Sequence, residues 1–230
     1  MCGRYTLFAS QSAIEDRFDA SFARGFEPRY NCAPGQHLPL LTSDDPDQFS
    51  FKKWGLIPSW ADDDSTSFIN ARAETVREKR SFAEPFESRR CLVPADGFYE
   101  WTDRDGGKQP YRVAYEDDRL FAMAGLWERW TPRVRQTGLG EFGGGVESEA
   151  EPVETFTVVT TKPNAVVSDL HHRMAVVLAP GEEAVWLDGS PDEAFDLLDP
   201  APAAEWTAYP VSTRVNSPAN DGPELVEAVE

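Results

Sequence analysis

Short apolar runs that end at a glycine or proline recur along most of this sequence, and they restrict its fold more than any other feature. FSFKKWGLIPSW (49–60) begins with alternating apolar and polar residues and breaks at Gly55 and Pro58, which predicts a strand that enters a loop. CLVPADGFYEW (91–101) is an apolar strand with a Pro-Ala-Asp-Gly turn inside it. Because most segments are strand-like, we expect an α+β fold with peripheral helices.

Helical patterns are confined to a few short segments. SQSAIEDRFDASFA (10–23) places Ile14, Phe18 and Phe22 four residues apart behind a serine cap, which predicts a short amphipathic helix. Residues 72–90 are charged and largely helical in pattern, with an interruption at a proline, and an acidic helix is expected near 190–199.

The middle of the chain combines two strands with a segment that has no periodicity. QPYRVAYED (109–117) and RLFAMAGLWERW (119–130) are predicted to form a hairpin. Residues 131–154 are rich in Gly, Glu and Pro, and a strand, ETFTVVTTKPN (154–164), follows them. We interpret 131–154 as a flexible loop or insertion inside one domain that spans residues 1–230.

Composition excludes several classes of protein. No apolar run approaches the roughly 18 residues of a membrane span, and the start has no basic segment followed by an apolar one, so we expect a cytoplasmic protein with no membrane partner. The net charge of −18 argues against non-specific nucleic-acid binding but leaves room for a local basic cleft. An acidic surface with few lysines suits solubility in very high salt, or simply an ordinary acidic protein.

The cysteines do not predict a metal or a disulfide framework. The chain has three, Cys2, Cys32 and Cys91, with no C-x-x-C spacing, so a zinc site would need ligands from three distant segments. We therefore predict neither a metal nor an organic cofactor.

Cys2 carries the most specific chemistry in the sequence. If Met1 is removed, one residue holds a free amine, with a reference pKa of about 7.7–8.0, beside a thiol. A neutral amine can attack an aldehyde, and the tethered thiol can then close a five-membered thiazolidine. The thiol could instead act as an acyl-transfer nucleophile, or simply be a buried small apolar residue.

Acid-base groups are few. HHRM (171–174) lies between a polar turn and an apolar run, where His171 or His172 could shuttle protons, or form an ordinary surface pair. Glu100, between Tyr99 and Trp101, is expected to have a raised pKa if its strand is buried, and to point to water if the strand is an edge.

NARAET (70–75) offers an amide and a guanidinium two residues apart. On an extended chain Asn70 and Arg72 share a face, where Arg72 could clamp a phosphate and Asn70 could hold an amine or a sugar oxygen. The alternative is a helix start with Asn70 as its cap.

Eight segments support a more specific interpretation when they are taken together: MCGR (1–4), YNCAPGQ (30–36), WGLIPSWA (54–61), NARAET (70–75), CLVPADGFYEW (91–101), AGLWE (124–128), TVVTT (157–161) and HHRM (171–174). In this order they resemble the SRAP family (SOS-response-associated peptidase), sensors and shields of abasic sites in single-stranded DNA. The match runs from residue 1 to residue 217.

The resemblance implies a barrel-like core of twisted antiparallel strands, a positively charged cleft for single-stranded DNA, and a covalent thiazolidine crosslink through Cys2 after Met1 removal. It implies four catalytic residues, Cys2, Asn70, Glu100 and His171, and seven DNA-binding residues, Arg4, Asn31, Pro34, Trp60, Arg72, Thr160 and Arg173. We expect a monomer whose partner is single-stranded DNA containing abasic sites, and which associates with the nucleoid when bound to DNA.

The sequence departs from the family at two positions near the histidines. His172 and Ala175 stand where the family commonly has Asp and Pro, but the spacing to Arg173 favours His171 as the proton shuttle. Two alternatives remain open: an N-terminal cysteine amidohydrolase or peptidase, and a non-catalytic module that only binds single-stranded DNA. Lyase and self-processing activities are also compatible with the family.

Overall fold

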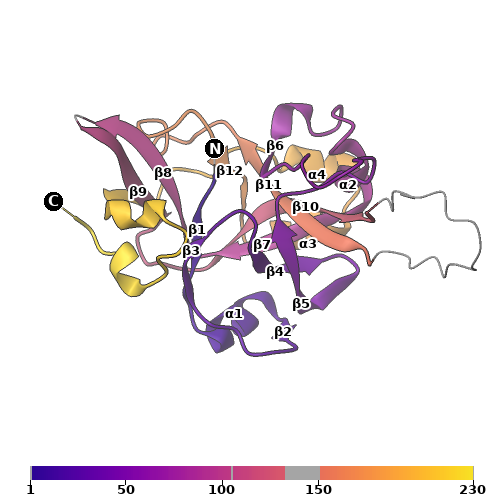
Figure 1. The fold of residues 1–230 in the computed structure, drawn as a ribbon, viewed down its shortest axis with the longest axis horizontal. Coiled ribbons are helices and arrows are strands. Elements are labelled where there is room, and N and C mark those ends of the chain that lie inside the picture. Colours follow the sequence, from indigo (N-terminus) through magenta and orange to yellow (C-terminus); the bar gives the residue numbers. More distant parts are fainter. Residues whose placement is uncertain (1, 105, 133–150, 230) are drawn as a thin grey trace, which may run out of the picture.

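A closed five-stranded barrel forms the centre of the fold. The computed structural model describes residues 2–104, 106–132 and 151–229. The barrel closes because its last strand pairs with both its neighbour and the first strand of the ring (Figure 1). The ring consists of β5 (Asp45–Trp54), β4 (His37–Thr42), β7 (Arg90–Ala95), β10 (Phe121–Trp130) and β11 (Val153–Thr161).

Four two- or three-residue strands extend the barrel at its edges. They are β2 (Ser21–Phe22), β6 (Asn70–Arg72), β12 (Met174–Ala175) and β13 (Val177–Leu178). β6 runs parallel to β11 and β12 runs antiparallel to it, so β11 joins the segment that begins at Asn70 to the segment that follows the histidines.

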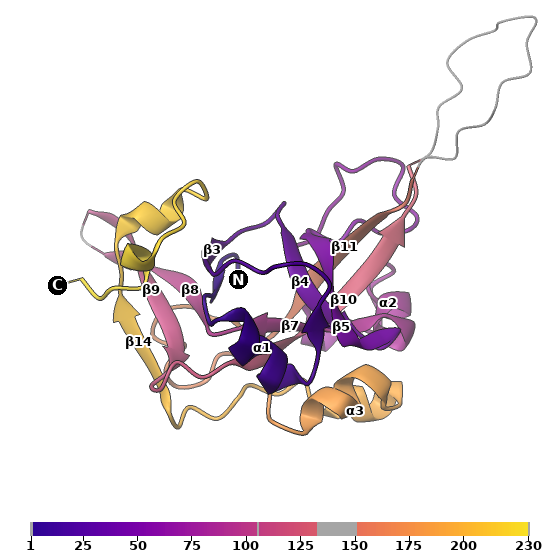
Figure 2. The same cartoon turned by 90° about the horizontal axis from the view of Figure 1, so that it is seen from below.

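A second, antiparallel sheet lies beside the barrel and includes the start of the chain (Figure 2). Its strands, in spatial order, are β14 (Trp206–Pro210), β9 (Gly107–Tyr115), β8 (Gly97–Arg104), β1 (Tyr5–Leu7) and β3 (Arg29–Cys32). The apolar segment 91–101 is therefore divided at Asp96: its first half is a barrel strand and its second half belongs to the other sheet. This division places Glu100 where the two sheets meet.

The helices are short and peripheral: α1 (Gln11–Phe18), α2 (Ala83–Ser88), α3 (Glu182–Asp188), α4 (Pro191–Asp196), and the 3₁₀ helices η1 (Ala73–Thr75), η2 (Thr213–Asn216) and η3 (Pro223–Leu225). Ser10 caps α1 by accepting a hydrogen bond from the Ala13 N–H, which confirms the predicted helix start. The helix ends at Phe18 because Asp19 adopts a left-handed conformation, and Phe22 lies in a strand.

Two sequence-based expectations about secondary structure were wrong. The segments 109–117 and 119–130 do not form a hairpin: β9 pairs with β8 and β14, whereas β10 pairs with β7, β11 and β13. The segment 72–90 is helical only within η1 and α2. Most of the expected loop or insertion at 131–154 lies outside the described residues.

One apolar core connects the barrel with the second sheet, and the α+β, barrel-like fold class is confirmed. Tyr5 of the second sheet packs its ring 5.4 Å from that of Trp54 in the barrel, and both are buried. Within the described part of the chain, no helix is long and apolar enough to cross a membrane.

Candidate active site

The start of the chain is held in place by its pairing with β8. Tyr5 lies opposite Phe98 in antiparallel register, and the Tyr99 N–H donates to the Arg4 carbonyl at 3.0 Å. This register brings the residues before β1 alongside Glu100. The Cys2 side chain is fully buried, and burial, followed by the nearby Glu100 carboxylate, raises the pKa of its thiol. The thiol is therefore protonated at neutral pH in this state.

Asn70 fixes Cys2 from the barrel side. β6 lies beside β11 with Asn70 opposite Val158, and the Asn70 Nδ2 donates to the carbonyl oxygens of Cys2 at 2.9 Å and Ile69 at 2.6 Å. Its Oδ1 is buried and has no hydrogen-bond partner among the described residues. Asn70 thus keeps a buried acceptor beside the backbone of Cys2.

Glu100 and His171, two titratable side chains, lie beside each other in the site. Glu100 is 2% exposed, and burial raises the pKa of its carboxyl to about 7. His171 Nδ1 lies 3.9 Å from Glu100 Oε2. Burial lowers the pKa of His171, so the imidazole is predominantly neutral at neutral pH. One group is poised between its two protonation states, and the other is available to accept a proton.

The backbone of Arg173 suits either protonation state of His171. The ring Nδ1 lies 3.1 Å from both the N–H and the carbonyl oxygen of Arg173. An unprotonated Nδ1 accepts from the N–H, and a protonated Nδ1 donates to the carbonyl, with little movement of the ring. His172 is exposed, with its ring 4.3 Å from that of His171. This geometry favours His171 for proton transfer.

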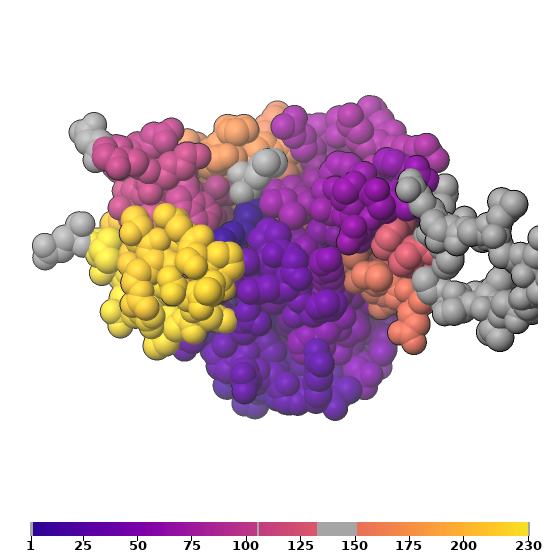
Figure 3. Space-filling view, viewed as in Figure 1, coloured from indigo at the N-terminus to yellow at the C-terminus, as the bar shows by residue number. Residues whose placement is uncertain are grey.

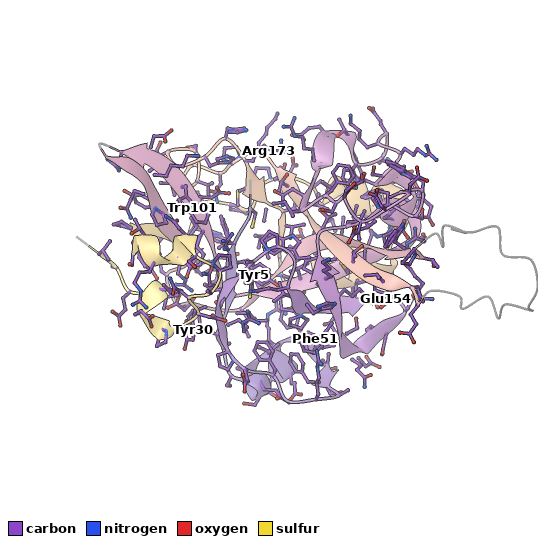
Figure 4. All side chains as sticks on the ribbon, in the orientation of Figure 1. Tyr5, Tyr30, Phe51, Trp101, Glu154 and Arg173 are labelled. Atoms are coloured by element: carbon purple, nitrogen blue, oxygen red, sulfur yellow. The ribbon has the colours of Figure 1, made fainter. Side chains whose placement is uncertain are left out.

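Glu100 and His171 line a cavity of about 470 Å³ together with Arg4, Trp101, Lys108 and Asn216. In Figure 3 the indigo chain start is visible between the yellow C-terminal segment and the central strands. In Figure 4 Trp101 lies on the side of the second sheet and Arg173 on the barrel side. The cavity therefore lies at the junction of the two sheets.

Three residues that line the cavity were not predicted from the sequence. Trp101 follows Glu100 directly, and Lys108 is one of few lysines, so weak signals existed for both. Asn216 comes from η2, far along the chain, and its Oδ1 accepts from the Trp101 indole N–H at 2.8 Å. Arg4 donates to the Asn216 carbonyl at 3.3 Å. Only the fold brings this C-terminal segment to the site.

The predicted DNA-binding residues differ in exposure. Arg72 is exposed, whereas Arg4, Pro34 and Trp60 are half-buried. Pro34 and Trp60 lie outside the lining of the cavity. The guanidinium of Arg80 covers the Trp60 ring at 4.9 Å from its centroid, so a base would have to stack on the other face or displace Arg80.

Two of the predicted DNA contacts are buried framework residues in this structure. Asn31 is 0% exposed, and its Nδ2 donates to three carbonyls around η2, those of Val215, Ser217 and Asn220. Thr160 is 1% exposed and donates to the Ala71 carbonyl at 3.3 Å. These hydrogen bonds hold the walls of the site, and neither side chain reaches the surface.

Arg173, the third buried member of that set, is held by protein groups. It is 8% exposed, its Nη1 and Nη2 lie 2.5 and 3.0 Å from the Glu74 carboxylate oxygens, and Nη2 also donates to the Thr160 carbonyl at 2.5 Å. Its guanidinium is therefore less accessible to a DNA phosphate than the guanidinium of the exposed Arg72.

No metal-binding arrangement was found within the described ranges, where no three His, Cys, Asp or Glu side chains gather closely enough to hold an ion. Cys32 and Cys91 are free and buried in the core. The chemistry of the site therefore has to be argued from Cys2 and the acid-base groups around it.

Comparison with solved structures identifies the class of fold. A crystal structure of a protein from Bacteroides thetaiotaomicron superimposes with a TM-score of 0.84 at 27% identity, and the match covers 100% of both chains. The barrel and the second sheet thus belong to one shared architecture.

Sequence comparison then gives the family. The family model "SOS response associated peptidase (SRAP)" matches residues 1–218, and this chain belongs to that family. The abasic site processing protein YoqW of Bacillus subtilis is 42% identical over 99% of this chain and 100% of its own length. The abasic site processing protein HMCES of Gallus gallus is 35% identical over 89% of this chain and 67% of its own.

Proposed function

We propose that this chain recognises abasic sites in single-stranded DNA and captures them covalently through Cys2 once Met1 is removed. The observation that carries the proposal is that Cys2 and Asn70 lie beside Glu100 and His171, and that the latter two line one cavity. The names of the relatives, abasic site processing proteins, support the substrate class.

The proposed reaction has three stages: opening of the sugar ring, formation of an imine with the Cys2 amine, and ring closure by the Cys2 thiol. Abasic deoxyribose is mostly a closed hemiacetal. Its ring C–O bond breaks as Glu100 donates a proton to the ring oxygen and the anomeric hydroxyl loses its proton, which gives the aldehyde. The neutral Cys2 amine adds to the aldehyde carbon, its nitrogen loses both of its protons, and the former carbonyl oxygen takes them up and leaves as water to give an imine. The thiol then adds to the imine carbon, and its proton passes to the nitrogen. The product is a thiazolidine.

The environment of Cys2 sets the order of these steps. Burial keeps the thiol protonated, so it is a poor first nucleophile. Once the imine has formed, sulfur and carbon belong to one molecule, and Glu100 or His171 can accept the thiol proton. The free Oδ1 of Asn70 is suited to accept from the α-amine and direct its lone pair at the aldehyde.

A denaturing gel tests the proposal. Purified protein mixed with an abasic-site oligonucleotide is expected to give a band at the combined mass, and an oligonucleotide without the lesion is expected to give none. A shift seen only on native gels would indicate a non-covalent binding module. Hydrolysis of glutamine or peptide amides without a crosslink would indicate an amidohydrolase.

The two adjacent histidines are expected to behave differently. His171→Ala should slow crosslinking by about 10²-fold or more, because it removes a positioned proton shuttle, whereas His172→Ala should remain close to the unmodified protein. Single-turnover time courses on denaturing gels measure both rates. Slow His172→Ala with normal His171→Ala would show that the assignment is reversed.

Arg72 is expected to supply a phosphate contact despite the net charge of −18. Arg72→Ala should weaken non-covalent binding to single-stranded DNA and reduce the slope of log affinity against log salt by about 0.7, the value for one phosphate on a single strand. Titrations at several salt concentrations measure this slope. Arg119→Ala is the control, because it removes the same charge from an arginine that is already ion-paired with Glu205. If Arg72→Ala and Arg119→Ala gave the same slope of log affinity against log salt, Arg72 would not contact a DNA phosphate.

A further inference from the structure

The orientation of His171 depends on a residue that follows it. Both hydrogen-bonding partners of its Nδ1 within the segment 171–173 are backbone groups of Arg173, each at 3.1 Å. The ring can keep these contacts only while the backbone at Arg173 stays where it is. Regular pairing with β11 begins one residue later, at Met174 of β12. The His171 N–H donates to the Val167 carbonyl at 2.9 Å, but this contact does not fix the backbone at Arg173.

Glu74 supports this part of the backbone through the Arg173 side chain. Its two carboxylate oxygens accept from Nη1 and Nη2 of Arg173 at 2.5 and 3.0 Å, which is a two-point contact that resists rotation. The Thr160 carbonyl accepts a further hydrogen bond from the same guanidinium. Glu74 lies in η1 and Thr160 in the barrel strand β11, so Arg173 is held from two different elements.

The two side chains of the Arg173–Glu74 ion pair differ in their exposure to solvent. The Arg173 side chain is 10% exposed and that of Glu74 is 44% exposed. The guanidinium is thus enclosed, whereas the carboxylate closes it off from solvent. The pKa of Glu74 is lowered, chiefly by its hydrogen bonds with Arg173, so the pair is intact at neutral pH.

We propose that Glu74 is a positioning residue for His171: by holding Arg173 it fixes the backbone groups that orient the His171 imidazole toward Glu100. The proposal rests on the proposed function only for its effect on rate. It differs from a role in which Glu74 competes with a DNA phosphate for Arg173. Losing a competitor would strengthen DNA binding, whereas losing a positioning contact would slow the reaction and leave binding unchanged.

Glu74→Gln separates these two roles, with Glu78→Gln as the matched control. Glu78 is exposed and near in sequence, and no ion pair involves it among the described residues, so its variant loses the same charge without disturbing Arg173. We expect Glu74→Gln to slow single-turnover crosslinking at saturating DNA by about 10-fold or more, because small misplacements of reacting groups are costly. Glu78→Gln should match the unmodified protein, and Glu74→Asp, which keeps the charge, should lie between.

Affinity is measured on an oligonucleotide with a stable abasic analogue that has no aldehyde, so that no crosslink forms. Glu74→Gln and Glu78→Gln should bind it within about 2-fold of each other, since each removes one negative charge. Binding by Glu74→Gln more than about 5-fold tighter than by Glu78→Gln would show competition with phosphate and overturn the proposal, as would equal crosslinking rates.

A second measurement needs no DNA. The chain has three histidines, so ¹⁵N NMR of the imidazole rings can be assigned with His37 and His172 variants. The ring nitrogens of His171 should show one defined pattern of protonation and hydrogen bonding in the unmodified protein and in Glu78→Gln, and a changed, averaged pattern in Glu74→Gln. An unchanged His171 spectrum in folded Glu74→Gln would disprove the positioning role, even if the proposed function itself were wrong.

Discussion

Replacing Cys2 with serine is expected to abolish the crosslink that survives denaturation, while an imine that borohydride can trap still forms. The serine variant keeps the α-amine and the environment of Asn70, so the first step is retained. A hydroxyl is a far weaker nucleophile than a thiol, and ring closure to a stable product is lost. Because the stable product itself is lost, this is the largest effect expected of any single substitution.

The measurement compares denaturing gels with and without borohydride. Cys91→Ala is the control: it also removes a buried thiol, but from β7 of the barrel, outside the cavity lining, and it should crosslink normally. Intact-mass spectrometry of active protein should show that Met1 is absent. Active protein that retains Met1, or a serine variant from which borohydride traps nothing, would show that the amine is not the first nucleophile.

Local sequence patterns predicted the elements better than their partners. The Ser10 cap and the strands around 49–54 and 91–101 follow from hydrogen-bonding and alternation rules that act over a few residues. The pairing of strands depends on contacts between residues distant in sequence. β10 is buried along nearly its whole length as a barrel strand, so its residues carry no alternation that could reveal its partners. The predicted hairpin failed for this reason.

The site shows the same limit. Residue chemistry identified Cys2, Glu100 and His171 as candidates, and the structure brings them together. The proximity of Cys2 to Glu100 follows from the pairing of β1 with β8, and that of His171 depends on the pairing of β12 with β11; no local pattern indicates either. Asn31 was predicted from the family resemblance to bind DNA, and in this structure its amide donates to carbonyls around η2. A motif can identify a residue as part of a site, but it does not show whether the side chain binds the ligand or holds the surrounding protein in place.

Glu100→Gln is expected to slow crosslinking by about 10²–10⁴-fold, the usual cost of losing a general acid-base group, with little change in affinity for abasic DNA. The pH profile should change as well. With a pKa of about 7, Glu100 loses its acid form as the pH rises from 6 to 8, while the neutral fraction of the Cys2 amine increases over the same range. These opposing trends predict a shallow maximum near neutral pH. The variant should lose the falling limb, so that its low rate rises steadily with pH.

Stability provides the control that separates lost chemistry from lost folding. The folded-state pKa of Glu100 lies above the value of about 4.3 for an unfolded glutamate, so the folded protein binds more protons between these values. The stability linked to this proton is complete below pH 4 and is lost as the pH rises through 7. A neutral amide of the same shape avoids that loss, and the variant should melt at or above the temperature of the unmodified protein at pH 8. A Glu100→Gln variant that crosslinks at a normal rate, or whose rate still falls above pH 7, would show that another group donates the proton.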